Sequence, residues 1–273
     1  MDDDATYILG SSRAEQERLA AQARAIAGTS RRLLERVGIR PGMRVLDVGC
    51  GHGKVTSLIA SLVGAHGRVM GLDRDARVLA VARDRIRDLG LSNVELVDGD
   101  MNQLGSEHGL FDAIVGRRVL MYQAHPVDAV RGMLSALRPG GLVVFQEQDT
   151  TMVPASLTPL PLHDQVQDWL WRTVEGEGAD RHMGFHLRSV LRQAGLAVAE
   201  IRAEAIVQTP DTPDRLGMIV AAILPRIVEQ GVATEAEIDV ATLTRRLTRE
   251  RQEADAVYIG DMVFGAWARK PAP

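Results

Sequence analysis

Short apolar runs alternate with amphipathic segments along the first half of the chain. The runs are rich in β-branched and aliphatic residues and predict five strands, at residues 44–48, 68–72, 94–97, 111–115 and 142–146. Between them, apolar positions recur at helical spacing, which predicts helices at 54–63, about 78–89 and about 126–138. Strict alternation of this kind is typical of βαβ units, whose strands form a parallel, doubly wound sheet.

The N-terminal segment departs from this alternation. Residues 14–37 are rich in Ala, Leu, Arg and Glu at helical spacing, and the pattern ends at Gly38 and Pro41. We therefore expect a helical extension over residues 1–40, followed by one domain over residues 41–273.

The second half of the chain adds elements of a different kind. Prolines at 154, 159 and 161 exclude a helix or an interior strand just before residue 162. Helices are expected at 164–175 and 187–194, strands at 198–207 and 257–268, and mostly helix at 210–255. The expected fold is α/β and Rossmann-like, with a mostly parallel seven-stranded sheet and helical lid insertions at about 150–180 and 210–255.

Composition and charge narrow the class of protein. The 273 residues carry 32 basic and 36 acidic side chains, a net charge of −4, whereas nucleic-acid binders rely on a basic surface. No apolar run approaches the roughly 18 residues that span a bilayer, and the acidic start MDDDATY differs from a signal peptide. We expect a cytoplasmic protein without a nucleic-acid or membrane partner. A single cysteine, Cys50, excludes an intramolecular disulfide and a Cys-cluster metal site.

The segment VLDVGCGHG, residues 45–53, is the strongest chemical signal. It lies where the first strand turns into a helix, and glycines there let a ligand approach the backbone N–H groups. A dinucleotide-binding turn would read GxGxxG, but Lys54 takes the third glycine position and the glycine falls one residue early, at Gly53. Asp47 disfavours a pyrophosphate and suits a ligand that carries an ammonium group.

Together with the acids that end the second and third strands, this segment resembles the class I S-adenosylmethionine-dependent methyltransferases. The resemblance covers roughly residues 44–146 and is weaker toward the C-terminus. It implies S-adenosylmethionine as the cofactor. It also implies the following cofactor-binding residues: Asp47, Gly49, Gly51, Gly53, Asp73, Arg74, Asp100, Met101 and Arg117.

The same resemblance implies a role for each of these residues. The three glycines pass under the methionine and ribose, and Asp47 acts on the amino group through backbone or water. Asp73 takes the ribose hydroxyls and Arg74 flanks the adenine. Asp100 and Met101 clamp the adenine, and Arg117 lines the methionine with its backbone.

The candidate catalytic residues are Tyr7, Tyr122 and Glu147. Glu147 and Asp149 follow the fifth strand and Tyr122 follows the fourth, where the ends of parallel strands face the ligand crevice. Tyr7 falls where many small-molecule methyltransferases fold an aromatic residue over the site. A plain packing or loop role remains the alternative for each.

Two pairs of closely spaced aromatic side chains lie in the second half of the chain. Trp169 and Trp171 are two apart on a helix and cannot share a face, so we expect at least one to line a pocket instead of packing in a core. His182 and His186 are four apart but lack a third ligand at set spacing, so no metal site is expected.

Sequence motifs that the chain lacks narrow the class of methyl acceptor. The chain reads Val115-Gly116-Arg117-Arg118 where amino-group methyltransferases of DNA carry an Asn/Asp-Pro-Pro-aromatic motif, and it lacks the paired glutamates of protein arginine methyltransferases. We expect methyl transfer to N, C or O of a small, aromatic or amine-bearing acceptor, by a chain that could form a homodimer. An NAD-dependent oxidoreductase and a non-catalytic S-adenosylmethionine-binding protein are the alternatives.

Overall fold

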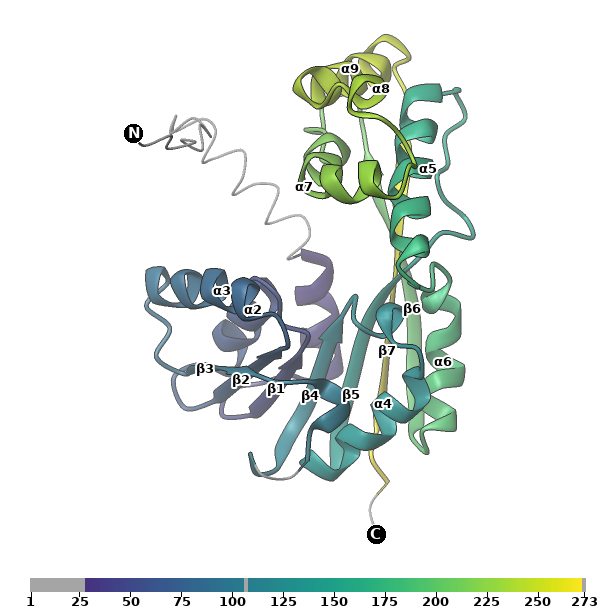
Figure 1. Ribbon diagram of the computed structural model, residues 1–273. Helices are drawn as coiled ribbons and strands as arrows, with labels where there is room; N and C mark the ends of the chain where they lie inside the picture. The colour runs from purple at the N-terminus through teal and green to yellow at the C-terminus, as the bar shows by residue number, and fades with distance from the viewer. Residues whose placement is uncertain (1–27, 106–107, 272–273) are drawn as a thin grey trace, which may run out of the picture.

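The computed structural model describes residues 28–105 and 108–271, and these form a sheet covered by helices on both faces with a helical cap above one edge (Figure 1). The strands of the sheet are β1 (Arg44–Val48), β2 (Arg68–Asp73), β3 (Val94–Asp98), β4 (Phe111–Arg117), β5 (Leu137–Asp149), β6 (Ala197–Gln208) and β7 (Tyr258–Arg269). The helices are α2 (Lys54–Val63), α3 (Ala76–Asp88), α4 (Pro126–Met133), α5 (Pro161–Gly176), α6 (Met183–Gln193), α7 (Leu216–Glu229), α8 (Glu235–Ile238) and α9 (Val240–Glu253). Three short 3-10 turns are η1 (Met101–Gln103), η2 (Leu120–Tyr122) and η3 (Leu134–Ala136), and residues 28–37 form a further helix.

Among the described residues the sheet has seven strands in the order β3-β2-β1-β4-β5-β7-β6. The pairs from β3 to β5 are parallel, and β7 runs antiparallel between β5 and β6. Strands β2 and β3 are added on one side of β1, and β4 and β5 on its other side, so the carboxyl ends of β1 and β4 form a topological switch point, where such sheets bind ligands. The predicted fold class is confirmed.

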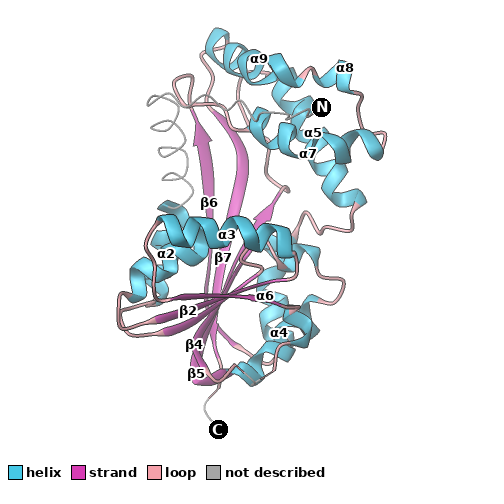
Figure 2. Ribbon diagram, turned by 60° about the vertical axis from the view of Figure 1, so that its left-hand side comes forward, coloured by secondary structure: helices cyan, strands magenta, loops and turns pink. Residues whose placement is uncertain are grey.

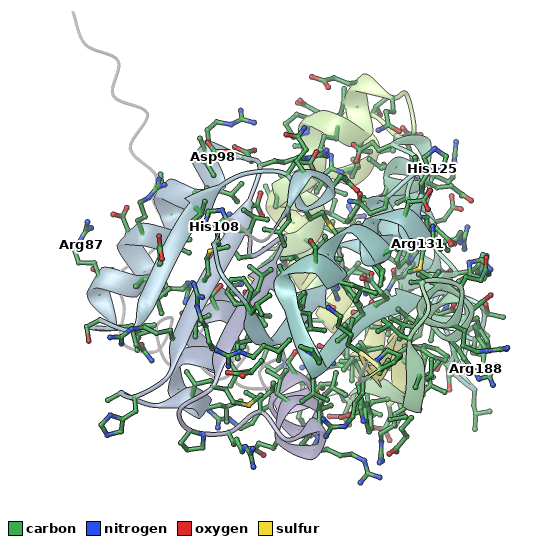
Figure 3. All side chains as sticks on the ribbon, turned by 90° about the horizontal axis from the view of Figure 1, so that it is seen from below. Arg87, Asp98, His108, His125, Arg131 and Arg188 are labelled. Carbon is green, nitrogen blue, oxygen red and sulfur yellow. The ribbon has the colours of Figure 1, made fainter. Side chains whose placement is uncertain are left out.

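Each face of the sheet is covered by its own apolar cluster. One cluster joins α2 and the helix at 28–37 to residues such as Val45 and Val144, and the other joins α4 and α6 to residues such as Leu46 and Phe145. Alternate residues of β1 therefore pack on opposite faces, as expected for a strand covered on both sides. Figure 2 shows α2 and α3 in front of the sheet, and Figure 3 shows Arg87 of α3 and Arg188 of α6 projecting outward on opposite sides.

The helical cap consists of α5, α7, α8 and α9. It has a third apolar cluster, which joins Trp169 of α5 to Val220 of α7 and Leu247 of α9. The long strands β6 and β7 continue past the rest of the sheet and reach the cap (Figure 1). The two insertions expected at about 150–180 and 210–255 thus meet in one body above the carboxyl ends of the parallel strands.

The fourth helix and the fifth strand differ from the prediction. The helix ends at Met133 instead of about residue 138, and β5 starts at Leu137, which pairs with Phe111 of β4. The strand also continues to Asp149, because β7 pairs with it as far as Met262. The turn residues Pro139-Gly140-Gly141 predicted that the fifth strand starts later, but pairing with neighbouring strands overrides this local preference.

Candidate active site

The glycine turn after β1 has the backbone that its sequence predicts. Gly49, Gly51 and Gly53 all have positive φ, of 63°, 52° and 71°, a region that other residues rarely adopt. A Cβ on Gly49 would also lie 2.7 Å from Cγ2 of Val119, whereas a Cβ on Gly51 would meet nothing within 4 Å. The first glycine is required for packing as well as for conformation, and the second lies beside open space.

Asp73, at the end of β2, holds this turn in place. Its Oδ2 accepts a hydrogen bond from the Gly51 N–H at 2.8 Å, and its Oδ1 accepts one from the Asp75 N–H at 3.0 Å. Each carboxylate oxygen has a second lone pair, so both can still accept from ligand hydroxyls.

Five of the predicted cofactor-binding residues, Gly49, Asp73, Arg74, Asp100 and Met101, line one cavity of about 150 Å³, which we call the turn cavity, whereas Gly51 and Gly53 lie outside its wall. It is lined by Gly49, Leu72, Asp73, Arg74, Gly99, Asp100, Met101, Arg118, Val119, Tyr122 and Gln123. Asp100 begins η1, where its Oδ1 accepts from the Asn102 N–H at 2.9 Å, and Met101 is buried. Two carboxylates and an apolar floor fit a nucleoside, whose hydroxyls and exocyclic amine are donors and whose base is flat.

Asp47 and Arg117 lie beneath the turn and outside the wall of this cavity. Burial raises the pKa of Asp47 to about 7, although Oδ2 accepts a 2.6 Å hydrogen bond from the Thr56 hydroxyl. Burial and the neighbouring Arg118 lower the pKa of Arg117 to about 9, and its Nε has no hydrogen-bond partner among the described residues. Neither side chain lines the turn cavity, so the role of Asp47 toward the amino group of the cofactor stays a prediction.

A second cavity, of about 180 Å³, lies between the sheet and the cap, and we call it the cap cavity. It is lined by Arg118, Met121, Tyr122, Gln148, Gln167, Leu170, Trp171, Val174, Ile206, Gln208, Arg215, Leu216, Ile219, Ile223, Arg226 and Asp261. Arg118 and Tyr122 also line the turn cavity, so the two cavities adjoin at these side chains. Burial raises the pKa of the Tyr122 phenol, which keeps it protonated near neutral pH.

Glu147 lies under the segment that carries Tyr122. It belongs to β5 and is fully buried, and its Oε1 accepts from the N–H groups of Val119 at 3.0 Å and Leu120 at 2.9 Å. Burial raises its pKa to about 7, and Oε2 finds no hydrogen-bond partner in the part of the chain that the structure describes. It lines neither cavity, so these contacts give it a positioning role toward η2. Its catalytic role stays a prediction.

Asp149 also has structural partners. Its Oδ1 accepts from the Thr151 N–H at 2.8 Å and its Oδ2 from the Phe185 N–H at 3.2 Å, so it joins the end of β5 to α6. Tyr7, the third candidate catalytic residue, lies outside the described residues.

The interpretation of the two tryptophans is wrong in one respect, because both are buried in apolar clusters. Trp169 packs in the apolar cluster of the cap. Trp171 packs in the cluster that joins α4 and α6 to the sheet, and it also lines the cap cavity. Helix α5 lies between two cores, so opposite faces of it can both be apolar. His182 and His186 face Thr151 and Asp180, and no group of three potential metal ligands occurs among residues 28–105 and 108–271.

The sequence did not single out Arg118, Arg215 or Asp261 as functional residues. Arg118 and Arg215 are almost 100 residues apart and come together only because the cap closes over the sheet. Only Arg118 carried a local signal, since it directly follows a strand at the ligand edge. Its backbone φ is +52°, a conformation that costs a non-glycine residue about 1–2 kcal/mol and is concentrated at functional sites.

A family model described as a methyltransferase domain matches residues 39–195, more than half of the chain. The chain belongs to this family. The match covers all the predicted cofactor-binding residues and confirms the resemblance drawn from the glycine turn and the strand-end acids. It also decides against the NAD-dependent oxidoreductase. No helix among the described residues is both long enough and apolar enough to cross a bilayer.

Individual proteins give a shorter match. The ubiquinone/menaquinone biosynthesis C-methyltransferase UbiE of Pseudomonas savastanoi pv. phaseolicola is 41% identical over 115 residues, which is 42% of this chain and 45% of that protein. The chain thus matches less than half the length of this curated relative.

Two solved structures share the fold. A putative methyltransferase from Bacillus halodurans has a TM-score of 0.60 at 18% identity, covering 90% of this chain and 100% of its own. The [4+2]-cyclase SpnF has a TM-score of 0.57 at 22% identity, covering 90% of this chain and 82% of its own. These likenesses confirm the architecture.

Proposed function

We propose that the protein transfers a methyl group from S-adenosylmethionine to a small-molecule acceptor held in the cap cavity. The observation that carries this proposal is that the turn cavity and the cap cavity adjoin at Tyr122 and Arg118. One cavity offers carboxylates that can accept hydrogen bonds from the hydroxyls and amine of a nucleoside, and the other has a largely apolar wall, so the two reactants would meet at their junction.

Each predicted cofactor-binding residue has a role in this proposal. Asp73 accepts the ribose hydroxyls, while Asp100 and Met101 bind the adenine edge and face. Arg74, exposed on the rim of the turn cavity, flanks the base. The backbone of the glycine turn lies beneath the methionine portion, with Asp47 and Arg117 underneath.

The chemistry requires alignment more than activation. S-adenosylmethionine supplies a sulfonium methyl group that is already electrophilic, so its transfer depends chiefly on an in-line approach of the acceptor. The protonated Tyr122 phenol at the junction donates a hydrogen bond that orients the acceptor. Glu147 holds the N–H groups at the start of η2 and thereby sets the position of Tyr122.

The proposal is tested by separating cofactor binding from turnover. Asp73→Asn should weaken binding of S-adenosylhomocysteine by roughly 10-fold or more, because hydrogen bonds between a carboxylate and hydroxyls are charge-assisted. Asp98→Asn is the matched control, since Asp98 ends the neighbouring strand, is exposed and lies outside the cavity (Figure 3). Binding is measured by isothermal titration calorimetry.

Turnover is measured by transfer of labelled methyl from S-adenosylmethionine into fractionated cell extract. We expect label in the small-molecule fraction. Tyr122→Phe should lower turnover by more than it weakens cofactor binding, because Tyr122 lines both cavities. Label in protein or RNA would contradict the acceptor class. Cofactor binding without any transfer would favour the non-catalytic alternative.

The same assay tests Glu147 directly. A proton-transfer role would make Glu147→Gln lose turnover by about 100-fold or more, whereas a positioning role would leave most of it, because Gln keeps the oxygen that accepts from Val119 and Leu120. A cytoplasmic location and a homodimer stay predictions.

A further inference from the structure

The cap cavity has an apolar body with a charged end. Its apolar wall comes from η2, α5 and α7, with Met121, Leu170, Trp171, Val174, Leu216, Ile219 and Ile223. Three arginines, Arg118, Arg215 and Arg226, also line it, against a single carboxylate, that of Asp261. The lining is therefore cationic as well as apolar.

The three arginines differ in how their charges are balanced. Arg226 is paired with Glu177 through two contacts, of which Nε to Oε1 measures 2.6 Å. Arg118 and Arg215 have no carboxylate oxygen within 4.0 Å of the guanidinium in the part of the chain described here, and neither side chain makes a hydrogen bond there. Asp261 already accepts a hydrogen bond from the Gln148 amide.

Leaving these cations without a partner is unfavourable. Burial lowers the pKa of Arg215, and proximity to Arg118 lowers it further, while Asp261 opposes both effects. Arg118 is held in its left-handed backbone conformation by a 2.9 Å hydrogen bond from its N–H to the Gln146 carbonyl, which keeps the side chain at the junction of the cavities. A ligand anion bound between the guanidinium groups of Arg118 and Arg215 would compensate both positive charges.

We propose that the acceptor is an amphipathic organic acid, whose apolar body fills the cap cavity and whose carboxylate or phosphate binds between Arg118 and Arg215. This inference rests on the proposed function, because it assigns the substrate class of the same site. Guanidinium groups bind such anions in a bidentate manner, which also orients the rest of the ligand. An amine-bearing acceptor would meet repulsion from the same arginines.

The cofactor has a carboxylate of its own, which other residues would bind. Lys54 and Arg117 line neither cavity wall, and both lie close enough to Asp47 or to the arginine pair to interact electrostatically with them. In this proposal Lys54 and Arg117 bind the carboxylate of the cofactor's methionine portion. The cofactor and the acceptor therefore bind to different cationic side chains.

The test compares three probes with one ring system and different charge: 2-naphthoate, naphthalene-2-methanol and 2-naphthylmethylammonium. Each is titrated calorimetrically into the full chain saturated with S-adenosylhomocysteine. We expect 2-naphthoate to bind at least about 10-fold more tightly than the alcohol, and the ammonium to bind most weakly. Arg215→Gln should remove most of this preference while changing the affinity for S-adenosylhomocysteine less than about twofold.

Arg172→Gln is the control, because Arg172 is on α5 but is exposed, pairs with Asp168 and does not line the cavity. Equal affinity for the three probes would overturn the proposal. The proposal would also be overturned if Arg215→Gln weakened the affinity for S-adenosylhomocysteine as much as the affinity for 2-naphthoate. The arginines would then bind the cofactor's carboxylate. Failure of the wild-type chain to bind S-adenosylhomocysteine would instead overturn the proposed function.

Discussion

Asp47 and Glu147 are two buried carboxyl groups that lie under the site. Each accepts hydrogen bonds from a neighbouring segment, Asp47 from Thr56 of α2 and Glu147 from the start of η2. Burial raises both pKa values to about 7, from ordinary values of 3.8 and 4.5. Asp47 thus joins β1 to α2 beneath the glycine turn, and Glu147 supports η2, which carries Tyr122, at a cost in stability that depends on pH.

The raised pKa values give a definite sign to the pH dependence of stability. Well below pH 3.8, the ordinary pKa of Asp47, both groups are protonated in the folded and unfolded chains, so burial carries no ionic penalty. As the pH rises toward 7, the unfolded chain releases these protons while the folded chain retains them, and the free energy of unfolding falls. Stability from these two groups is therefore greatest in acid and is lost as the pH passes through 7.

Glu147→Gln should reduce this loss. The variant keeps the accepting oxygen but cannot ionise, so its free energy of unfolding should fall less than that of the wild type between pH 5 and pH 8, by about 3 kcal/mol at most. Urea unfolding at the two pH values measures this, with the exposed Glu95→Gln as the control. A variant with the pH dependence of the wild type would mean that Glu147 ionises freely in the folded chain.

At the scale of elements, a buried polar network holds the cap together. Arg251 of α9 is fully buried and donates to the Thr209 carbonyl at 2.9 Å, to Gln208 at 3.0 Å and to Asp214 at 3.2 Å. Glu250 accepts from the N–H groups of Leu162 and His163 at the start of α5, at 2.8 and 3.0 Å. Two adjacent residues of α9 thereby join α5 to the end of β6 and to the loop before α7.

Arg251→Met should destabilise the chain by about 3–5 kcal/mol, because it leaves the buried Asp214 carboxylate without its cation. Adding Asp214→Asn should recover part of the loss. Thermal and urea unfolding measure both variants, and Arg249→Met, at an exposed position paired with Glu253, should change stability by no more than about 0.5 kcal/mol. A loss for Arg251→Met no larger than this control would show that the network adds little to stability.

At the scale of the whole molecule, the site is formed between two bodies that each have a core. The parallel strands supply the turn cavity at their carboxyl ends, and the cap supplies the far wall of the cap cavity. A backbone hydrogen bond from the Asp180 N–H to the Met121 carbonyl, at 2.7 Å, joins the first insertion to η2. Ligand binding at the sheet is thus connected to the cap through the segment that carries Tyr122.

S-adenosylhomocysteine should therefore slow amide hydrogen exchange in both bodies. We expect protection over residues 49–54 and 99–101, next to the ligand, and over 150–180, through η2. Exchange followed by mass spectrometry measures this, with residues 197–204 of the edge strand β6 as the internal control. Protection limited to the glycine turn would show that the cap does not respond to the cofactor.

Local patterns in the sequence were sufficient for the cofactor half of the molecule. The bounds of β1 and α2 agree with the prediction, because a short apolar run and a glycine turn are encoded within a few neighbouring residues. Asp73, Asp100 and Met101 could be located for the same reason, since each follows a strand whose end is marked locally and parallel strands end at one edge.

The acceptor half was decided by contacts between distant segments. The length of β5 depends on its pairing with β7, and that pairing places Glu147 inside the strand instead of after it. Burial of both Trp169 and Trp171 depends on a second core that only the assembled cap supplies. Arg118 meets Arg215 only when the cap lies over the sheet. The sequence by itself determined the fold class and located the strand-end residues that line the turn cavity, whereas the charge and shape of the cap cavity came from tertiary packing, because no local pattern records which distant residues will share a wall.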